Sequence, residues 1–283
     1  MKSDASLKGK IKAVAKKSNL KPQELLQMYL FEHLLMRLEK SEYAEVFVLK
    51  GGLLISSMMG IARRTTMDMD ATVIGMNMDE KTVTDAVSTI CAVDVGDGMD
   101  YSFERIEPIR EVDEYANWRA RLRIRYGKID APVKVDITTG DEITPGFVEY
   151  RYPFMFEEGS ARVLSYSLET VLAEKLETVV SRGVANTRGR DFYDIHTLLC
   201  LKARDINREL LREAIASTAS KRGSVDKMAD YQAILREVKE SGIMRGVWAS
   251  YVSGSPYVAG IEFEDVVDSA VKLAGFAGLE ELN

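Results

Sequence analysis

Hydrophobic residues recur along the chain with two periods, which predict where helices and strands lie. Between residues 21 and 38 apolar side chains are spaced three and four apart, as in an amphipathic helix with one buried stripe, and Pro22 suits its first turn. Residues 46–49 form a short β-rich run that ends at Lys50-Gly51-Gly52. The LLISSMM segment that follows is a helix pattern closed by Gly60. We therefore expect a strand, a tight glycine turn and a helix.

Three later stretches alternate apolar and polar residues with the period of a strand, namely 67–74, 118–126 and 133–137. From Ser167 the pattern turns helical and stays so almost to the end, with breaks near 183–189 and 253–256. Strands separated by a helix and followed by more strands imply an α/β or α+β sheet with helices against it.

We therefore predict an α+β protein with three parts, each built around one kind of secondary structure. Residues 1–44 form a helical leader that packs on the core, residues 45–160 form a mixed-sheet domain, and residues 161–283 form a helical C-terminal domain. The C-terminal helices are expected to contribute side chains to the site.

Composition limits the protein class without identifying it. The 283 residues are 46% hydrophobic and 29% charged, which is ordinary for a soluble globular protein. There are 38 Lys and Arg against 44 Asp and Glu, a net charge of −6, so the overall field does not attract nucleic acid, although a local basic surface is allowed. Two distant cysteines, a charged N-terminal segment and the lack of an apolar run of about 20 residues predict a cytoplasmic protein without membrane insertion.

The first chemical signal is a DxD pair within the stretch 67–74. On a strand, Asp68 and Asp70 share one face, whereas Met67, Met69 and Ala71 would face the core. Two carboxylates held this close repel each other, so a partly buried pair needs a counter-cation.

Asp136 is a candidate third ligand, because its neighbours in 133–137 alternate and place it on the polar face of a strand. Three oxygen ligands suit Mg²⁺, which keeps waters and shares its remaining positions with phosphates. Two such ions would activate an attacking oxygen and neutralise a leaving pyrophosphate. An isolated DxD is more often a solvated strand edge.

The glycine turn favours a metal site over a solvated strand edge as the interpretation of the DxD pair. Gly51 and Gly52 would let backbone N–H groups and a helix N-terminus approach a triphosphate, although glycine's ordinary role is to allow a positive φ. A strand, a glycine turn and a helix followed by DxD on the next strand is the order typical of the nucleotidyltransferase superfamily. A small difference is that this turn is often Gly-Ser in the superfamily, so Gly52 offers no hydroxyl to phosphate.

Further stretches make the resemblance closer. FVLKGGLLI, RTTMDMDATV, KVDITTGDEITP, YSLETVLAEKLETVVSRG and ANTRGRDFYDI resemble, in order and approximate spacing, the AbiEii/AbiGii toxin family of nucleotidyltransferases. The resemblance implies transfer of a nucleoside monophosphate from an NTP to an acceptor hydroxyl, with Mg²⁺ or Mn²⁺ as cofactor. It further implies a toxin of a bacterial toxin–antitoxin or phage-defence system, tRNA as acceptor and an antitoxin encoded nearby, whether or not the two proteins bind directly.

The resemblance also implies roles for particular residues. Metal would be bound by Asp68, Asp70 and Asp136. Asp191 would serve as general base or as organiser of Lys175. The nucleotide would contact the following residues: Lys50, Gly51, Gly52, Arg64, Thr66, Lys175 and Arg182.

The residues around Lys175 give independent support. Ser167 is a plausible N-cap of a helix whose apolar stripe contains Lys175, so the lysine needs an anionic partner or a route to solvent. It could bind phosphate as a point charge, or its stem could pack while the ammonium reaches solvent. Asp191 and Asp194 could instead form an N-cap and a second acid that stabilises the helix dipole.

The clearest basic feature is a run of alternating arginines that would share one face of a strand. Two interpretations stay open, namely phosphate or RNA recognition and cross-strand salt bridges to neighbouring acids. Beside the RDFYD-like segment, two more arginines are candidates for RNA or phosphate contacts. The residues concerned are Arg119, Arg121, Arg123, Arg125, Arg188 and Arg190.

Two other functions compete with the toxin enzyme. One is a non-catalytic nucleotide- or RNA-binding module with the same fold, and the other is a nucleotidyltransferase for a small molecule such as an aminoglycoside. Every acidic position expected of an active enzyme is present, which favours catalysis. The lysine helix and the RDFYD-like helix match the toxin family, which argues against the small-molecule enzyme.

Overall fold

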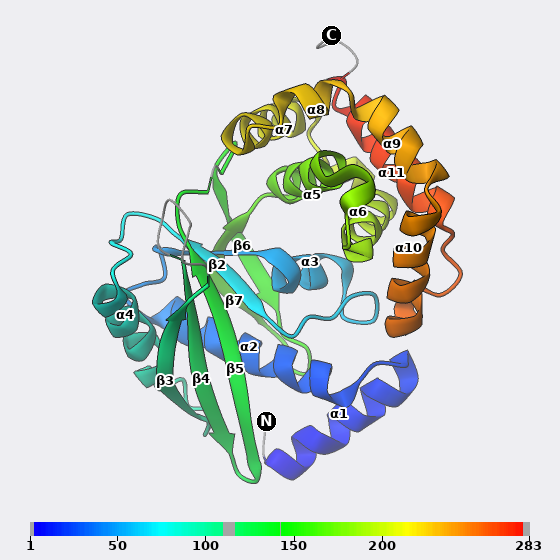
Figure 1. Ribbon diagram of the computed structural model, residues 1–283. Coiled ribbons are helices and arrows are strands. Elements are labelled where there is room, and N and C mark those ends of the chain that lie inside the picture. The colour runs from blue at the N-terminus through cyan, green and yellow to red at the C-terminus, as the bar shows by residue number, and fades with distance from the viewer. Residues whose placement is uncertain (1–2, 110–116, 142, 280–283) are drawn as a thin grey trace. The chain divides into compact units, whose positions relative to one another are not determined.

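The computed structural model describes residues 3–109, 117–141 and 143–279. The chain divides into two compact units, the first formed by residues 1–141 and 147–165 and the second by residues 142–146 and 166–283 (Figure 1). We call them the sheet unit and the helical unit.

The sheet unit contains helices α1 (Asp4–Ser18), α2 (Pro22–Lys40), α3 (Gly51–Met59) and α4 (Glu80–Ala92). Its strands are β1 (Phe47–Lys50), β2 (Met69–Val73), β3 (Asp100–Pro108), β4 (Trp118–Tyr126), β5 (Ile129–Thr138), β6 (Phe147–Pro153) and β7 (Ser160–Tyr166). The strands form one mixed sheet in the order β3-β4-β5-β2-β1-β7-β6. Strand β1 is antiparallel to β2 and parallel to β7, whereas β2 is parallel to β5. This confirms the predicted mixed sheet.

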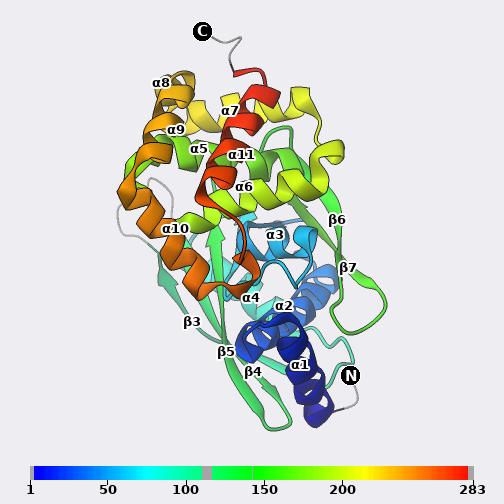
Figure 2. The same cartoon turned by 90° about the vertical axis from the view of Figure 1, so that its right-hand side faces the viewer.

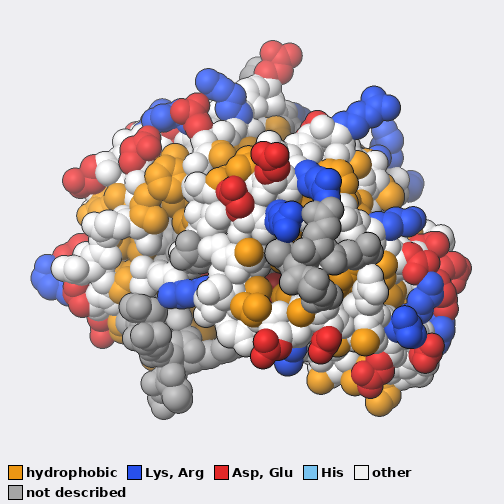
Figure 3. Space-filling model, turned by 90° about the horizontal axis from the view of Figure 1, so that it is seen from above, with side chains coloured by type: hydrophobic (Ala, Val, Ile, Leu, Met, Phe, Trp, Pro, Cys, Tyr) orange, Lys and Arg blue, Asp and Glu red, His pale blue; other side chains and the backbone are white. Residues whose placement is uncertain are grey.

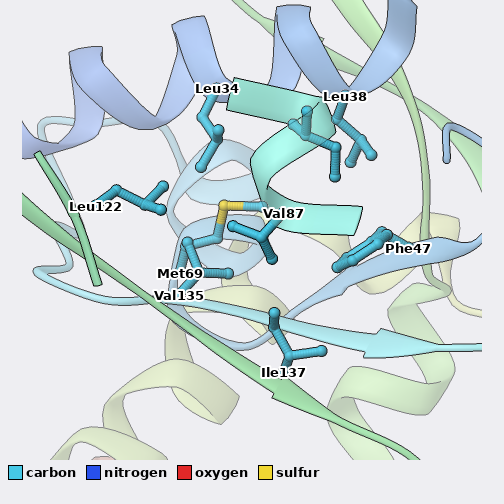
Figure 4. Close-up of a pocket in the computed structure, with 9 residues that line it drawn as sticks. Leu34, Leu38, Phe47, Met69, Val87, Leu122, Val135 and Ile137 are labelled. Carbon is cyan, nitrogen blue, oxygen red and sulfur yellow. The ribbon is translucent and has the colours of Figure 1, made fainter. Parts of the chain in front are cut away.

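Helices α2 and α4 cover one face of this sheet. Figure 4 shows apolar side chains from both helices pointing at side chains of β1, β2, β4 and β5 around a cavity of about 20 Å³. The cavity lining includes Met69 of β2 and Val135 of β5, both buried. Because successive strand residues point to opposite faces, Asp70 and Asp136 project from the other face.

A buried polar cluster fastens α2 to the loop before β3. Arg37 is 1% exposed and donates to Asp97 at 2.7 and 2.9 Å, while its guanidinium stacks over the Tyr101 ring at 4.0 Å. His33 Nδ1 lies 2.7 Å from the same carboxylate. Burial would raise the pKa of Asp97, but the hydrogen bonds from His33 and Arg37 hold it well below its usual range.

Several predicted elements are confirmed. The helix at 21–38 is α2, the glycine turn leads directly into α3, and the strand at 118–126 is β4. One prediction was wrong, because β2 begins at Met69 and not at residue 67. The ladder with β5 starts only at Met69, so Asp68 precedes the strand and Met67, expected in the core, is 38% exposed.

The sequence analysis did not identify α4, β3, β6 and β7. Strand β3 lacks clean alternation of buried and exposed residues, since its register with β4 shifts between Phe103 and Arg105. Strand β6 is largely exposed.

The helical unit consists of helices joined by short turns (Figure 2). They are α5 (Leu168–Arg182), α6 (Gly189–Lys202), α7 (Arg208–Arg222), α8 (Val225–Ala229), α9 (Tyr231–Glu240), α10 (Gly242–Gly254) and α11 (Phe263–Phe276). Helix α5 packs against α6 and α7, while α11 packs against α6 and α9. Ser167 caps α5 as predicted, because its side chain accepts a hydrogen bond from the Thr170 N–H.

Charged side chains of both signs lie among hydrophobic ones on the face seen in Figure 3, in keeping with the modest net charge. Within the described residues, no helix combines the length and the apolar character needed to cross a membrane.

Candidate functional site

Four charged residues lie side by side on four neighbouring strands of the sheet unit. The strand register pairs Lys50 with Asp70, Asp70 with Asp136, and Asp136 with Arg119. Residues paired directly across strands share one face of the sheet. The result is a row with the charge order plus, minus, minus, plus, which we call the charge row.

The glycine turn lies against the middle of the charge row. Gly51 has a φ of +66°, and a Cβ at this position would lie 2.2 Å from Asp70 Oδ2. The Gly52 N–H donates a hydrogen bond to the Asp70 carboxylate, at the first turn of α3. Burial raises the pKa of Asp70, and the charge of Asp136 adds to this, while Lys50 and the Gly52 hydrogen bond oppose it. A bulkier residue at Gly51 is therefore incompatible with this carboxylate position.

Arg64 and Thr66 come to the same turn. A Cβ at Gly52 would lie 2.7 Å from Thr66 Oγ1 and 3.6 Å from Arg64 Nη2. Arg64 is 5% exposed and donates to the carbonyl oxygen of Thr65. The structure thus brings these two predicted nucleotide contacts together with Gly51 and Gly52.

Asp136 is held by an arginine. Arg119 donates from Nε and Nη2 to the two carboxylate oxygens of Asp136, each at 2.7 Å. Such bidentate pairs are among the stronger charge-assisted hydrogen bonds. Asp68 lies at the edge of this region, with 46% of its side chain exposed and Lys134 Nζ at 3.2 Å from Oδ1.

Each of the three acids expected to bind metal thus has a different hydrogen-bond or ion-pair partner. Among the described residues, no group of three or more His, Cys, Asp or Glu side chains is placed to hold a metal ion. The donor chemistry nevertheless fits Mg²⁺, since Asp68, Asp70 and Asp136 offer only oxygen ligands and the charge of Asp136 raises the pKa of Asp70. For Asp136 to become a ligand, Arg119 would have to release it.

Asp141 is a polar neighbour that the sequence analysis missed. The Lys50 ammonium forms an ion pair with Asp141 and donates to Thr138 Oγ1 at 2.7 Å. Burial would raise the pKa of Asp141, but Lys50 holds it below its usual range. The available signal was the position of Asp141 in the TTGDE segment directly after β5.

The alternating arginines of β4 form ion pairs with acids of the neighbouring strands. Beyond Arg119, Arg121 Nε donates to Glu107 at 2.8 Å and Arg123 Nε donates to Glu104 at 2.7 Å. Arg125 lies 3.8 Å from Asp100, on the same neighbouring strand. The cross-strand salt bridges of one interpretation are thus present, and the phosphate or RNA contacts of the other stay a prediction.

The helical unit contains a second charged cluster, built around Lys175. Its Nζ lies 2.6 Å from Asp191 Oδ1 and 3.0 Å from Asp194 Oδ2. The lysine side chain is 18% exposed, whereas those of Asp191 and Asp194 are 3% and 0% exposed. Asp191 Oδ2 is buried and has no hydrogen-bond partner among the described residues. The lysine within the apolar stripe therefore has the anionic partners that its burial requires.

The N-cap interpretation of Asp191 was wrong, although this residue does place an acid in the first turn of α6. Arg188 is the N-cap of α6, Asp191 lies in the first turn, and Asp194 lies one turn further on against Lys175. Asp191 and Asp194 are three residues apart, so they share one face of a helix, which is the signal that could have identified both as partners of Lys175. Arg182 ends α5 and is exposed, as are Arg188 and Arg190 at the start of α6.

Three solved structures are similar to this chain. The protein JHP933 from Helicobacter pylori matches with a TM-score of 0.50 and 16% identity over 93% of this chain and 96% of its own. A proposed nucleotidyltransferase from H. pylori matches with a TM-score of 0.48 and 17% identity over 93% of this chain and 99% of that one. An antigenic nucleotidyltransferase-like protein from Paracoccidioides brasiliensis matches with a TM-score of 0.40 and 16% identity, covering 75% and 93%. A search of curated proteins found no match.

The mixed sheet with its helices has the fold of a nucleotidyltransferase. The family described as nucleotidyl transferase AbiEii toxin, Type IV TA system, matches residues 33–269. The chain belongs to this family, and it is a nucleotidyltransferase of the toxin–antitoxin kind.

Proposed function

We propose that this nucleotidyltransferase transfers a nucleoside monophosphate from an NTP to a hydroxyl of tRNA in a reaction that needs a divalent cation. The observation that carries the proposal is the charge row beside the glycine turn. Asp70 and Asp136 lie on adjacent strands, and Asp70 contacts the first turn of the helix that begins at Gly51. Carboxylates beside the N-terminus of a helix are the elements needed to hold a cation and a triphosphate together.

In the proposed reaction the acceptor oxygen forms a bond to the α-phosphorus, the bond from this phosphorus to the bridging oxygen breaks, and pyrophosphate leaves. We assign the acceptor's proton to the Asp136 carboxylate. When bound by Asp68, Asp70 and Asp136, Mg²⁺ or Mn²⁺ would neutralise charge on the attacking and leaving oxygens. The protein's contribution is positioning and electrostatic stabilisation.

Residues of the two units take separate tasks in this proposal. Gly51 and Gly52 would let phosphate oxygens approach the start of α3, and the Lys50 ammonium would contact these oxygens. Lys175 would bind triphosphate as a point charge, and the 2.6 Å ion pair supports Asp191 as the organiser of that lysine.

The enzymatic test uses purified full-length protein, Mg²⁺, each labelled NTP in turn and total tRNA. We expect label in tRNA with wild-type protein, none after chelation of the metal, and a loss of at least about a hundredfold with Asp70→Asn, since the ligand charge is removed. Asp130→Asn is a matched control, because Asp130 is an exposed acid of the same sheet that pairs with Arg123 and Arg125. Equal labelling by Asp70→Asn, or no labelling with any NTP, would contradict the proposal.

We also propose that the protein acts in the cytoplasm as the toxin of a phage-defence system, with an antitoxin encoded nearby as its functional partner. Expression should then arrest growth, and Asp68→Ala should relieve the arrest. Arrest that persists with Asp68→Ala would indicate toxicity by binding. Loss of protection against phage in a deletion strain, restored only by the active gene, would support the defence role.

A further inference from the structure

The sheet unit contains a cavity of about 220 Å³ at the end of α3 that is remote from the glycine turn. Its walls come from α2, from the last turn of α3 with the residues after it, and from the end of β6 and the segment that follows. Apolar contacts are offered by Met28, Ile61, Tyr152 and Met155. The charge row and its proposed reaction use none of these residues.

The polar centre of this cavity is the carboxyl group of Glu32. Glu32 is 3% exposed, and its Oε1 accepts a hydrogen bond from the Met155 N–H at 2.7 Å. Among the described residues, no hydrogen bond or ion pair reaches its second oxygen, Oε2. This oxygen is not one of the fully buried atoms without a partner; Glu32 lines the cavity, so a donor on a ligand could reach the oxygen there.

The protonation of Glu32 and the charges near it bear on whether the ligand is a cation. The pKa of Glu32 is raised to about 8, chiefly by burial and also by the charge of Glu157, while the Met155 hydrogen bond opposes the shift. The other titratable groups coupled to it are the phenols of Tyr29 and Tyr152, which are neutral at pH 7. The Glu157 carboxylate is thus the charge that acts on Glu32, and Glu32 becomes an anion only when its proton leaves, so a cation that pairs with it must displace this proton.

The other polar side chains of the wall already have partners. Ser56 Oγ donates to the Gly52 carbonyl oxygen at 2.7 Å, and Ser57 Oγ lies 2.9 Å from the Tyr150 hydroxyl. Glu32 is consequently the group that would orient a ligand, while the apolar wall would enclose the rest of it.

We propose that this cavity binds a small organic ammonium compound, whose cationic head lies against Glu32 and whose short alkyl or aryl body lies against Met28 and Tyr152. The cavity volume is below that of sites for drug-sized ligands, roughly 300–1,000 Å³, which limits the occupant to a compact amine. The proposal does not rest on the nucleotidyl transfer proposed above.

Calorimetric titration with n-butylammonium tests the proposal, with n-butanol as the uncharged probe of similar size. Because the carboxyl must ionise to receive the cation, binding should release close to one proton at pH 7, and affinity should rise about tenfold per pH unit between pH 6 and 7.5. Comparison of binding heats in two buffers of different ionisation enthalpy measures the proton release.

Two variants separate charge recognition from shape. Glu32→Gln keeps an acceptor for the Met155 N–H but cannot ionise, so butylammonium affinity should fall at least tenfold. Glu39→Gln, on the same helix and outside the cavity, should bind as wild type does. Thermal unfolding of both variants shows whether each is folded. Equal affinity in folded Glu32→Gln, equal binding of n-butanol, or no butylammonium binding by wild type would overturn the proposal.

Discussion

Replacement of Gly51 by alanine tests whether the glycine turn exists to admit the Asp70 carboxylate. Two penalties are expected, one from the backbone and one from the collision. A φ of +66° costs a residue with a Cβ about 1–2 kcal/mol, which a less flexible unfolded chain offsets by about 0.4–1 kcal/mol. The new Cβ would also lie 2.2 Å from Asp70 Oδ2 and 2.9 Å from Asp70 Cβ, and overpacking of this kind typically costs about 1–3 kcal/mol.

Gly75→Ala is a matched control that separates the two penalties. Gly75 has a φ of +67°, and a Cβ there would meet no atom within 4 Å. Gly75→Ala should therefore lower the free energy of unfolding by roughly 1 kcal/mol and Gly51→Ala by about 2–4 kcal/mol. Urea denaturation followed by tryptophan fluorescence in a Trp248→Phe background reports on Trp118, which lies in the sheet unit.

Nucleotidyl transfer provides the second measurement for this pair. Gly51→Ala should lose activity because Asp70 is displaced, whereas Gly75→Ala should retain it. If both variants lose the same stability and the same activity, the contact with Asp70 does not explain the glycine, and the reasoning is refuted.

Three further predictions concern buried or paired charges. Arg119→Ala frees the Asp136 carboxylate from hydrogen bonds to a charged group, which contribute about 1.5–3 kcal/mol. The affinity for Mn²⁺, measured by electron paramagnetic resonance, should therefore rise about tenfold or more. Arg121→Ala is the control and should leave this affinity unchanged. An unchanged affinity in Arg119→Ala would show that the arginine and the metal do not compete. Lys175→Met leaves two buried acids without their cation and should cost about 3–5 kcal/mol in urea denaturation, and a cost below about 1 kcal/mol would contradict the burial argument. Asp97 has a depressed pKa in the folded protein, so its contribution to stability is complete above about pH 4 and disappears as the pH falls. Asp97→Asn should accordingly be less stable at pH 7 and respond less to acid below pH 4, and equal acid sensitivity of the two proteins would contradict this.

The local hydrophobic period predicted correctly those elements in which buried and exposed residues follow each other regularly. From Ala120 to Tyr126, strand β4 alternates buried residues with half-buried or exposed ones, and its predicted bounds match. Strand β2 was extended too far because the alternation in MDMDATVI continues past the point where hydrogen-bonded partners exist. Partners on distant strands are not visible in local sequence, so neither this end nor the bulged strand β3 could be placed.

The same limit applies to the candidate site. Which residues carry chemistry could be predicted from residue type and spacing, as for Asp70 beside the glycine turn. What those residues contact could not be predicted, because the bidentate pairing of Arg119 with Asp136 depends on the register between β4 and β5. Arg121, Arg123 and Arg125 each have a partner on β3, which was not identified, and so the choice between ligand contacts and salt bridges stayed open.

The ion pairs between β3 and β4 have a consequence for solubility. Strand β3 stands at one end of the strand order, and an edge strand can recruit a strand from another molecule and start aggregation. Its exposed charged residues, Glu104 and Arg105, and the register shift beside them work against such pairing. When Glu104 or Arg105 is replaced by an uncharged residue, the protein should therefore first be shown to stay monodisperse. Only then can a change in catalysis be attributed to the substitution.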